Sequence, residues 1–143
     1  MAATKNGTEH ENRQLACRGI RGATTVDDNT ADAIREATQE LLTKLIEAND
    51  LKQEDITSVF FTATADLNAD YPAVTARQMG WRDVALMCGQ EMAVPHSLKK
   101  CIRVLIHWNT TRRNDEIHHV YIRGAVTLRP DLAFTFKPEK QES

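Results

Sequence analysis

The feature that most constrains the fold is a single long amphipathic segment at residues 27–50, DDNTADAIREATQELLTKLIEAND. Its large apolar side chains recur with the three- and four-residue spacing of one helical face. They are Ile34, Leu41, Leu42, Leu45 and Ile46. Asn29 or Thr30 can cap the start of this helix, and Asn49-Asp50 suits its end. We therefore expect one long helix packed against a sheet by its apolar stripe.

Most of the remaining chain has the composition of short strands, at residues 16–26, 56–64, 84–94, 97–108 and 117–132. In the second of these, Val59-Phe60-Phe61 hardly alternates, which predicts burial on both faces. Pro72 and Gly80 suit the first turn and the end of a short helix. The predicted order β-α-β-α-β-β-β gives an α+β fold, with one mixed β-sheet packed against one long and one short helix.

The length of 143 residues fits one domain with its own core. A net charge of −2 argues against non-specific nucleic-acid binding. The sequence has no run of about 18 apolar residues, so we expect no membrane span. Three scattered cysteines and the lack of an apolar leader favour free thiols in the cytoplasm. We expect a folded domain at 17–132, between a polar, disordered N-terminal tail at 1–16 and a polar C-terminal tail at 133–143.

Arg103 is the most unusual residue of the strand at 97–108, SLKKCIRVLIHW. Apolar residues alternate on both sides of it, so the strand pattern places its charge among apolar neighbours. A buried arginine nearly always has a partner, because its guanidinium cannot lose its charge. No acidic residue lies on the same strand. This placement points to a functional role for Arg103.

Other polar side chains lie on or beside the predicted strands and the short helix. They are Arg21, Arg77, Arg123 and Arg129, with Glu91, Cys88 and Tyr121. Several guanidinium groups around one pocket would bind a small dianion, because each can hold a carboxylate at two points. For Arg82 and Arg123, the simpler interpretation is that they are strand-surface charges paired across the sheet.

Several catalytic motifs are missing from the sequence: G-x-S-x-G, the Walker loop, G-x-G-x-x-G and H-E-x-x-H. His118 and His119 are adjacent, so they would lie on opposite faces of a strand and would not chelate one ion together. We expect these histidines to be at the surface or hydrogen-bonded, and we expect no metal site.

Four stretches of the chain resemble, in order, the monofunctional class of chorismate mutases with a trimeric pseudo-α/β-barrel arrangement. They are RGIRGATTV, TATADLNADYPAVTAR, CGQEMAV with LKKCIRV, and HVYIRGAVTLRPDL, and they span about residues 17–132. The resemblance implies an isomerase that converts chorismate to prephenate, for phenylalanine and tyrosine biosynthesis, by an intramolecular Claisen rearrangement without metal or cofactor. It also implies a homotrimer with active sites at subunit interfaces.

The resemblance also implies roles for particular residues. Arg21 and Tyr121 would contact the carboxylates of the substrate, and Arg103 would lie against its ether oxygen. Glu91, helped by Cys88, would bind the ring hydroxyl. By strand alternation these last two residues fall on opposite faces, so a shared pocket requires a bulge, which we expect at Gly89.

Further residues would line the site less directly. Leu128 and Arg129 belong to the C-terminal end that closes the pocket in the family. The neighbouring subunit would contribute Tyr71, Ala73, Val74 and Arg77. This sequence departs from the family pattern at two of these, with Tyr71 where phenylalanine is more frequent and Val74 in place of a commoner lysine. One residue is also missing in RQMGW.

Two other classes of protein fit parts of the pattern. One is an imine or enamine deaminase of a related trimeric fold, which also binds carboxylates with arginine at subunit clefts. The other is a regulatory module that binds an aromatic metabolite without turnover. The combination of Glu91, Arg103 and Tyr121 favours the mutase, because the deaminases are not expected to share it.

Overall fold

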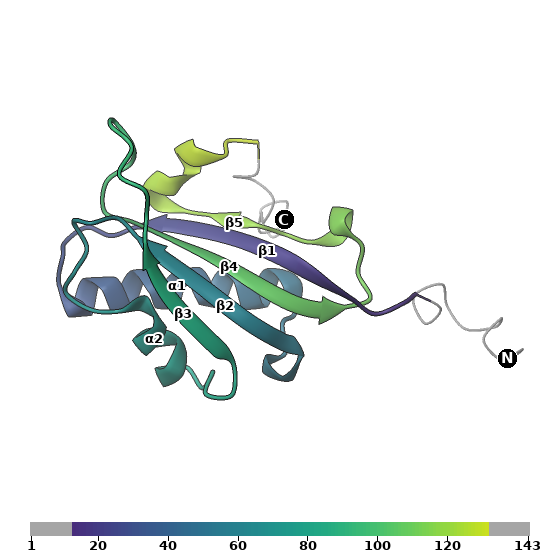
Figure 1. The fold of residues 1–143 in the computed structure, drawn as a ribbon. Helices are drawn as coiled ribbons and strands as arrows, with labels where there is room; N and C mark the ends of the chain where they lie inside the picture. Colours follow the sequence, from purple (N-terminus) through teal and green to yellow (C-terminus); the bar gives the residue numbers. More distant parts are fainter. Residues whose placement is uncertain (1–12, 132–143) are drawn as a thin grey trace, which may run out of the picture.

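Five strands form one sheet with two helices packed on it, and the computed structural model describes residues 13–131 (Figure 1). The strands are β1 (Ala16–Thr25), β2 (Ile56–Ala63), β3 (Ala85–Gln90), β4 (Cys101–Thr110) and β5 (Val120–Tyr121). The helices are α1 (Ala31–Asn49) and α2 (Pro72–Gln78), and the 3₁₀ helices are η3 (Gln53–Asp55), η4 (Asn114–Glu116) and η5 (Arg123–Leu128). The predicted tails lie outside the described residues except for positions 13–16. Neither described helix combines the length and apolar character that crossing a membrane requires.

The sheet is mixed, with the strand order β3-β2-β4-β1-β5. β4 runs antiparallel to both of its neighbours, β1 and β2. β2 pairs in parallel with β3, and β1 pairs in parallel with β5. The predicted order of elements and the α+β class are confirmed.

Helix α1 packs its apolar side chains into the core on one face of the sheet. Thr30 caps its start by accepting a hydrogen bond from the backbone of Ala33, and Asp50 ends it in the left-handed conformation. Its buried side chains include Ile34, Leu41, Leu42 and Leu45. Gly22 of β1 allows helix α1 to lie close to this strand, because a Cβ atom at Gly22 would lie 2.9 Å from Leu45 Cδ1.

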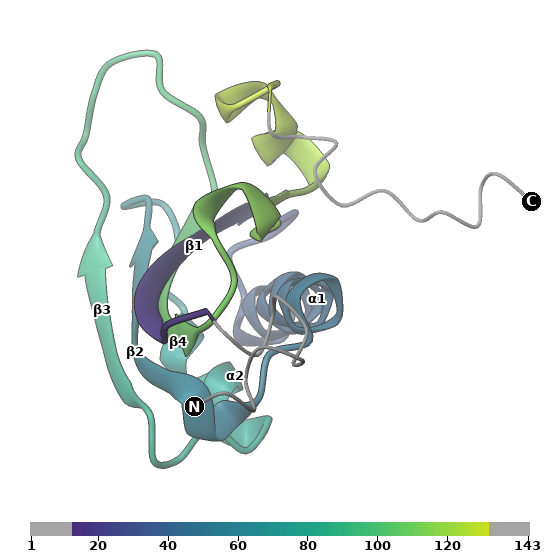
Figure 2. The ribbon, with the colours of Figure 1, turned by 90° about the vertical axis from the view of Figure 1, so that its right-hand side faces the viewer.

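Both helices lie on the same side of the sheet, which leaves the opposite face open in the single chain (Figure 2). Val59 and Phe61 of β2 face the helices and are fully buried, whereas Phe60 between them is exposed on the open face. The predicted burial of this strand on both faces is therefore wrong for one chain.

The expected short helix is confirmed, and Gly80 follows it with a φ of 107°.

The predicted strand at 117–132 is wrong over most of its length. Only Val120 and Tyr121 pair with β1, opposite Gly22 and Ala23. Arg123 then turns the chain with a φ of 53°, and the 3₁₀ helix η5 follows. The Arg123 Nε lies 2.9 Å from Glu40 Oε1, so this arginine pairs with an acid of helix α1 and not across the sheet as expected.

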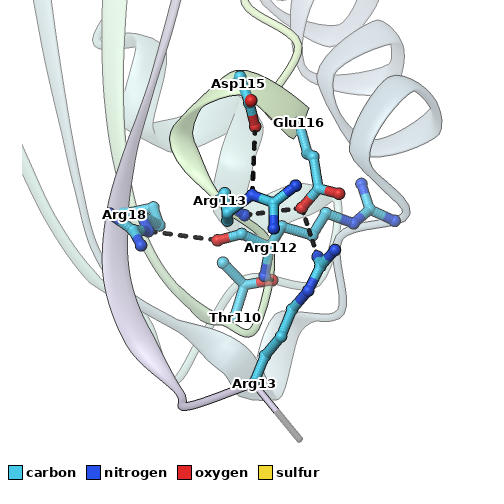
Figure 3. A network of polar contacts seen from close by, with 7 residues as sticks. All are labelled: Arg13, Arg18, Thr110, Arg112, Arg113, Asp115 and Glu116. Atoms are coloured by element: carbon cyan, nitrogen blue, oxygen red, sulfur yellow. Dashed lines mark hydrogen bonds and ion pairs between the residues drawn. The ribbon is translucent and has the colours of Figure 1, made fainter. Parts of the chain in front are cut away.

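A polar network fastens the connection between β4 and β5 (Figure 3). Arg13 Nη1 donates to Glu116 Oε1 at 2.6 Å, and the same oxygen accepts the backbone N–H of Arg113 at 2.8 Å. Arg18 Nε of β1 donates to the carbonyl oxygen of Arg112 at 3.2 Å. These contacts fix the segment that leads into β5.

Candidate active site

A hollow of about 250 Å³ lies on the open face of the sheet, where β1, β2, β4 and β5 meet the end of β3. Its lining residues are Arg21, Gly22, Phe60, Thr62, Glu91, Arg103, Val104, Leu105 and Tyr121. Four of them were singled out from the sequence: Arg21, Glu91, Arg103 and Tyr121. We call this place the arginine hollow.

Arg103 and Glu91 form an ion pair in the arginine hollow, with 3.1 Å between Arg103 Nε and Glu91 Oε2. The neighbours of Arg103 on β4, Ile102 and Val104, are buried toward the helices, and the arginine points to the other face. Its side chain keeps 49% of its surface exposed, against 23% for Glu91. The expectation of a charge among apolar side chains is thus wrong for the single chain, and its acidic partner comes from outside its own strand.

Glu91 is held at three points, although it lies beyond the last residue of β3. Its backbone N–H donates to the carbonyl oxygen of Ala63 at 2.9 Å. Its Oε2 atom accepts a hydrogen bond of 2.7 Å from Thr62 Oγ1, in addition to the contact with Arg103. Thr62 was not among the residues predicted for the site, because its position beside Arg103 depends on the register between β2 and β4.

Arg21 and Tyr121 enter the arginine hollow from the adjacent strands β1 and β5. The backbone N–H of Arg21 donates to His119 Nδ1 at 3.0 Å. Burial of the imidazole, followed by the charges of Arg21 and Arg129, lowers the pKa of His119. A neutral His119 keeps Nδ1 available as the acceptor, so this histidine is satisfied, as expected.

Leu128 and Arg129 lie at the end of the described C-terminal segment. Leu128 lines a wider hollow of about 1130 Å³, which also includes Glu91 and Arg103. Arg129 makes a two-point contact with Asp131, with 3.0 Å from Nε to Oδ1 and 2.8 Å from Nη2 to Oδ2. This contact lowers the pKa of Asp131, and the charge of Arg21 adds to the effect. Arg129 does not line the arginine hollow.

Cys88 and Tyr71 line a separate hollow of about 450 Å³. Cys88 pairs with the buried Phe61, and the pairing continues regularly through Gly89 and Gln90. The predicted bulge at Gly89 is thus wrong, and Cys88 remains on the helix side of the sheet, apart from Glu91. Burial raises the pKa of the Cys88 thiol, although the backbone of Ala73 and the charge of Arg77 oppose this shift.

Three further residues predicted for the site, Ala73, Val74 and Arg77, belong to helix α2. Ala73 is buried, Val74 is half-buried and Arg77 is exposed. Tyr71, which precedes the helix, keeps 67% of its surface exposed. Apart from Leu128 and Arg129 of the C-terminal segment, the predicted site residues of one chain therefore form two groups. One lines the arginine hollow on the open face. The other, which we call the α2 group, lies around α2 and consists of Tyr71, Ala73, Val74, Arg77 and Cys88.

The chemistry of the arginine hollow is that of a receptor for an anion with a hydroxyl group. Arg21 and Arg103 offer cationic donors, Tyr121 offers a phenol, and Glu91 offers a carboxylate acceptor. Within residues 13–131 no three His, Cys, Asp or Glu side chains are grouped as metal ligands would be. The hollow can hold and polarise a ligand through fixed charges.

Comparison with known proteins identifies the family. The model of the family described as chorismate mutase type I matches residues 17–132. The chain belongs to the chorismate mutase type I family. A chorismate mutase from Thermus thermophilus is 51% identical over 116 residues, which are 80% of this chain and 95% of that protein. One from Bacillus subtilis is 47% identical over 126 residues, 87% of this chain and 99% of that protein.

A solved structure agrees with the family match. It is a chorismate mutase from Clostridium thermocellum, with a TM-score of 0.76 and 54% sequence identity, and the match covers 77% of this chain and 98% of that one. The residues matched by the chorismate mutase model include both the arginine hollow and the α2 group. The findings do not favour the deaminase alternative.

Proposed function

We infer that the chain catalyses the rearrangement of chorismate to prephenate in the arginine hollow. One observation carries the assignment of the site. Arg21, Glu91, Arg103 and Tyr121 come from different elements of the fold and line one hollow. Chorismate has two carboxylates, a ring hydroxyl and an ether oxygen, so it presents a partner for each of these side chains. In this proposal Arg21 and Tyr121 contact the carboxylates.

The first task of the site is to hold the reactive conformer. In this rearrangement one C–O bond breaks while one C–C bond forms within the same molecule, so the enolpyruvyl group must lie over the ring. Arg21 and Tyr121 would fix the anionic groups, and Glu91 would accept a hydrogen bond from the ring hydroxyl. Fixing these points replaces a search among conformers with a bound, aligned geometry.

The second task is electrostatic. Negative charge grows on the ether oxygen as its bond to the ring lengthens. Arg103 would stabilise that charge more in the transition state than in the ground state, which is the condition for faster chemistry. Loss of one such preorganised donor typically costs about 2.7–4 kcal/mol. The reaction involves no nucleophile and no proton transfer, so we assign neither to this site.

The site is completed, in our proposal, by a neighbouring subunit of a homotrimer. The open face exposes apolar side chains in a row across the sheet, with Leu105 opposite Phe60 and Phe60 opposite Met87. Met87 alone keeps 62% of its surface exposed. Burying such a patch against another copy is favourable. Assembly would bring the α2 group of one chain to the arginine hollow of the next, with Leu128 and Arg129 beside it.

We propose that the protein works in the cytoplasm. Cys17, Cys88 and Cys101 are all unpaired thiols in the structure. Burial raises the pKa of Cys101 to about 11, so this thiol stays protonated and unreactive at neutral pH. Free thiols of this kind are typical of a reducing compartment.

The proposal is tested with the purified full-length chain and chorismate. Chorismate absorbance in the ultraviolet should fall in proportion to enzyme concentration, with prephenate as the product, in buffer containing a metal chelator and no added cofactor. A regulatory module would bind chorismate in calorimetry while its absorbance stayed at the uncatalysed rate. That second result would overturn the proposal.

A further inference from the structure

Thr62 is a polar residue that lines the arginine hollow and does not touch the substrate in the proposed reaction. Its hydroxyl donates to Glu91 Oε2 at 2.7 Å, which is a short, charge-assisted hydrogen bond. The same oxygen forms an ion pair with Arg103, at 3.1 Å from Nε. We propose that Thr62 is a positioning residue that holds the Glu91 carboxylate between the substrate hydroxyl and Arg103. The inference rests on the proposed function.

The sheet places Thr62 where it can act in this way. The residues in one row across the strands are Ala23 of β1, Arg103 of β4, Thr62 of β2 and Gly89 of β3. Thr62 is therefore the direct neighbour of Arg103. On its other side Gly89 has no side chain, and a Cβ atom there would meet no atom within 4 Å. The carboxylate of Glu91 can reach the hydroxyl over this open position.

Thr62 is also a rigid anchor. It lies in β2, which is paired on both sides, and a β-branched side chain has few χ1 conformers on a strand. Glu91, by contrast, follows the last residue of β3 and has a longer side chain. The fixed hydroxyl thus restricts the mobile carboxylate.

The two contacts on Oε2 determine how the Glu91 carboxylate is oriented toward the guanidinium of Arg103. Thr62 Oγ1 and Arg103 Nε both lie against Oε2 of the Glu91 carboxylate. In this proposal the other oxygen, Oε1, accepts the ring hydroxyl. Without the hydroxyl of Thr62, Glu91 is free to turn into a two-point pair with Arg103. Such a pair would occupy the cation needed by the ether oxygen and would withdraw the acceptor from the substrate.

The test compares the wild-type chain with Thr62→Val and Thr62→Ser in chorismate turnover. We expect Thr62→Val to lower kcat/KM about tenfold, with part of the loss in kcat, and Thr62→Ser to stay within about twofold of wild type. Thr57→Val is a matched control, because Thr57 also lies on β2 but donates its hydroxyl to the backbone of His107 at 3.1 Å. It should leave kcat and KM unchanged.

A double-mutant cycle separates positioning from a purely structural role. If Thr62 acts through Glu91, then Thr62→Val should have almost no additional effect on kcat/KM in a Glu91→Ala background. Thr62→Ala serves the same cycle should the valine variant not fold. Fully additive losses, an unchanged kcat/KM in Thr62→Val or Thr62→Ala, or equal losses in the valine and serine variants would overturn the inference. Failure of the wild-type chain to convert chorismate would instead overturn the proposed function.

Discussion

At the scale of single residues, the ion pair of Arg103 and Glu91 contributes mainly by fixing the position of the guanidinium in the site, and only little to stability. Half of the Arg103 side chain remains exposed in the single chain. Exposed pairs typically contribute only about 0–1 kcal/mol to stability. The sheet instead gives the guanidinium a fixed place on β4, the central strand of the sheet. A cation fixed before the reaction needs no reorganisation while charge develops in the transition state.

The pKa of His119 predicts how stability depends on pH. Its pKa is lowered in the folded chain, through burial and then the charges of Arg21, Arg129 and His118. Below pH about 6.5 the unfolded chain therefore binds a proton that the folded chain resists. The stabilisation is complete above that pH and is lost as the pH falls through the lowered folded value. We expect the melting temperature of the wild type to fall between pH 7 and pH 5.

The variant His119→Asn isolates this contribution, because its side-chain oxygen takes the place of Nδ1 and can accept the N–H of Arg21 but cannot be protonated. Its melting temperature should change less between pH 7 and pH 5 than that of the wild type. The lowered pKa values of Asp66, Glu116 and Asp131 act in both chains and cancel in the comparison. Parallel pH curves for the two chains would contradict the account of His119.

At the scale of elements, Asn49 joins the end of α1 to the segment before β5. Its side chain is fully buried. Its Nδ2 atom donates to the carbonyl oxygens of Leu45 at 3.1 Å and His118 at 2.8 Å, and its Oδ1 accepts the N–H of His118 at 2.8 Å. The helix that covers one face of the sheet thus holds the strand that carries Tyr121.

We expect Asn49→Ala to lower the free energy of unfolding by about 2–4 kcal/mol, because it leaves half-buried backbone groups of His118 without the partners that Asn49 supplies. Thermal unfolding should show a loss on the order of 5–15 °C for a chain of this size. Asn114→Ala, at an exposed position of η4, should change the melting temperature little. Equal stability of the Asn49 and Asn114 variants would show that the junction does not contribute as described.

The elements show what the sequence could predict and what it could not. Helix α1 followed from local periodicity, since Leu41 and Leu45 fall on one helical face and bury together. The predicted C-terminal strand is too long because the β-branched residues after Tyr121 suit a strand. In the structure Arg123 turns the backbone with a positive φ. Local propensity gave no sign of that turn.

The site could be predicted only in part, for a related reason. Arg103 stands out because a charge interrupts an apolar strand. Its neighbour Thr62 looks like any β-branched strand residue until the register of β2 and β4 is known. The separation of Cys88 from Glu91 likewise depends on β3 continuing without a bulge. Register is a tertiary property, and alternation within one strand does not determine it.

At the scale of the whole molecule, the two groups of site residues lie apart in one chain. The arginine hollow faces away from the helices, whereas Cys88 and the other residues of the α2 group lie on the helix side of the sheet. Figure 2 shows the uncovered face of the sheet opposite both helices. Assembly through this face would cover its apolar side chains and complete the site in the same step.

We therefore expect Met87→Asp to dissociate the assembly and to abolish most activity, because a buried carboxylate in an apolar contact is costly. Light scattering should give a wild-type mass three times that of the 16.1 kDa chain and a mass of one chain for the variant. Gln39→Asp adds the same charge on the exposed face of α1 and should leave mass and activity unchanged. A wild-type chain that is monomeric and fully active would contradict the proposed assembly.

The most direct test of the central claim is the kcat of Arg103→Lys for chorismate. The substitution keeps the charge but removes the planar, multi-donor geometry that can serve Glu91 and the ether oxygen together. We predict a fall in kcat of at least about tenfold, while the melting temperature and the mass in solution stay those of the wild type. An unchanged kcat would contradict the claim that Arg103 is the fixed cation of the rearrangement.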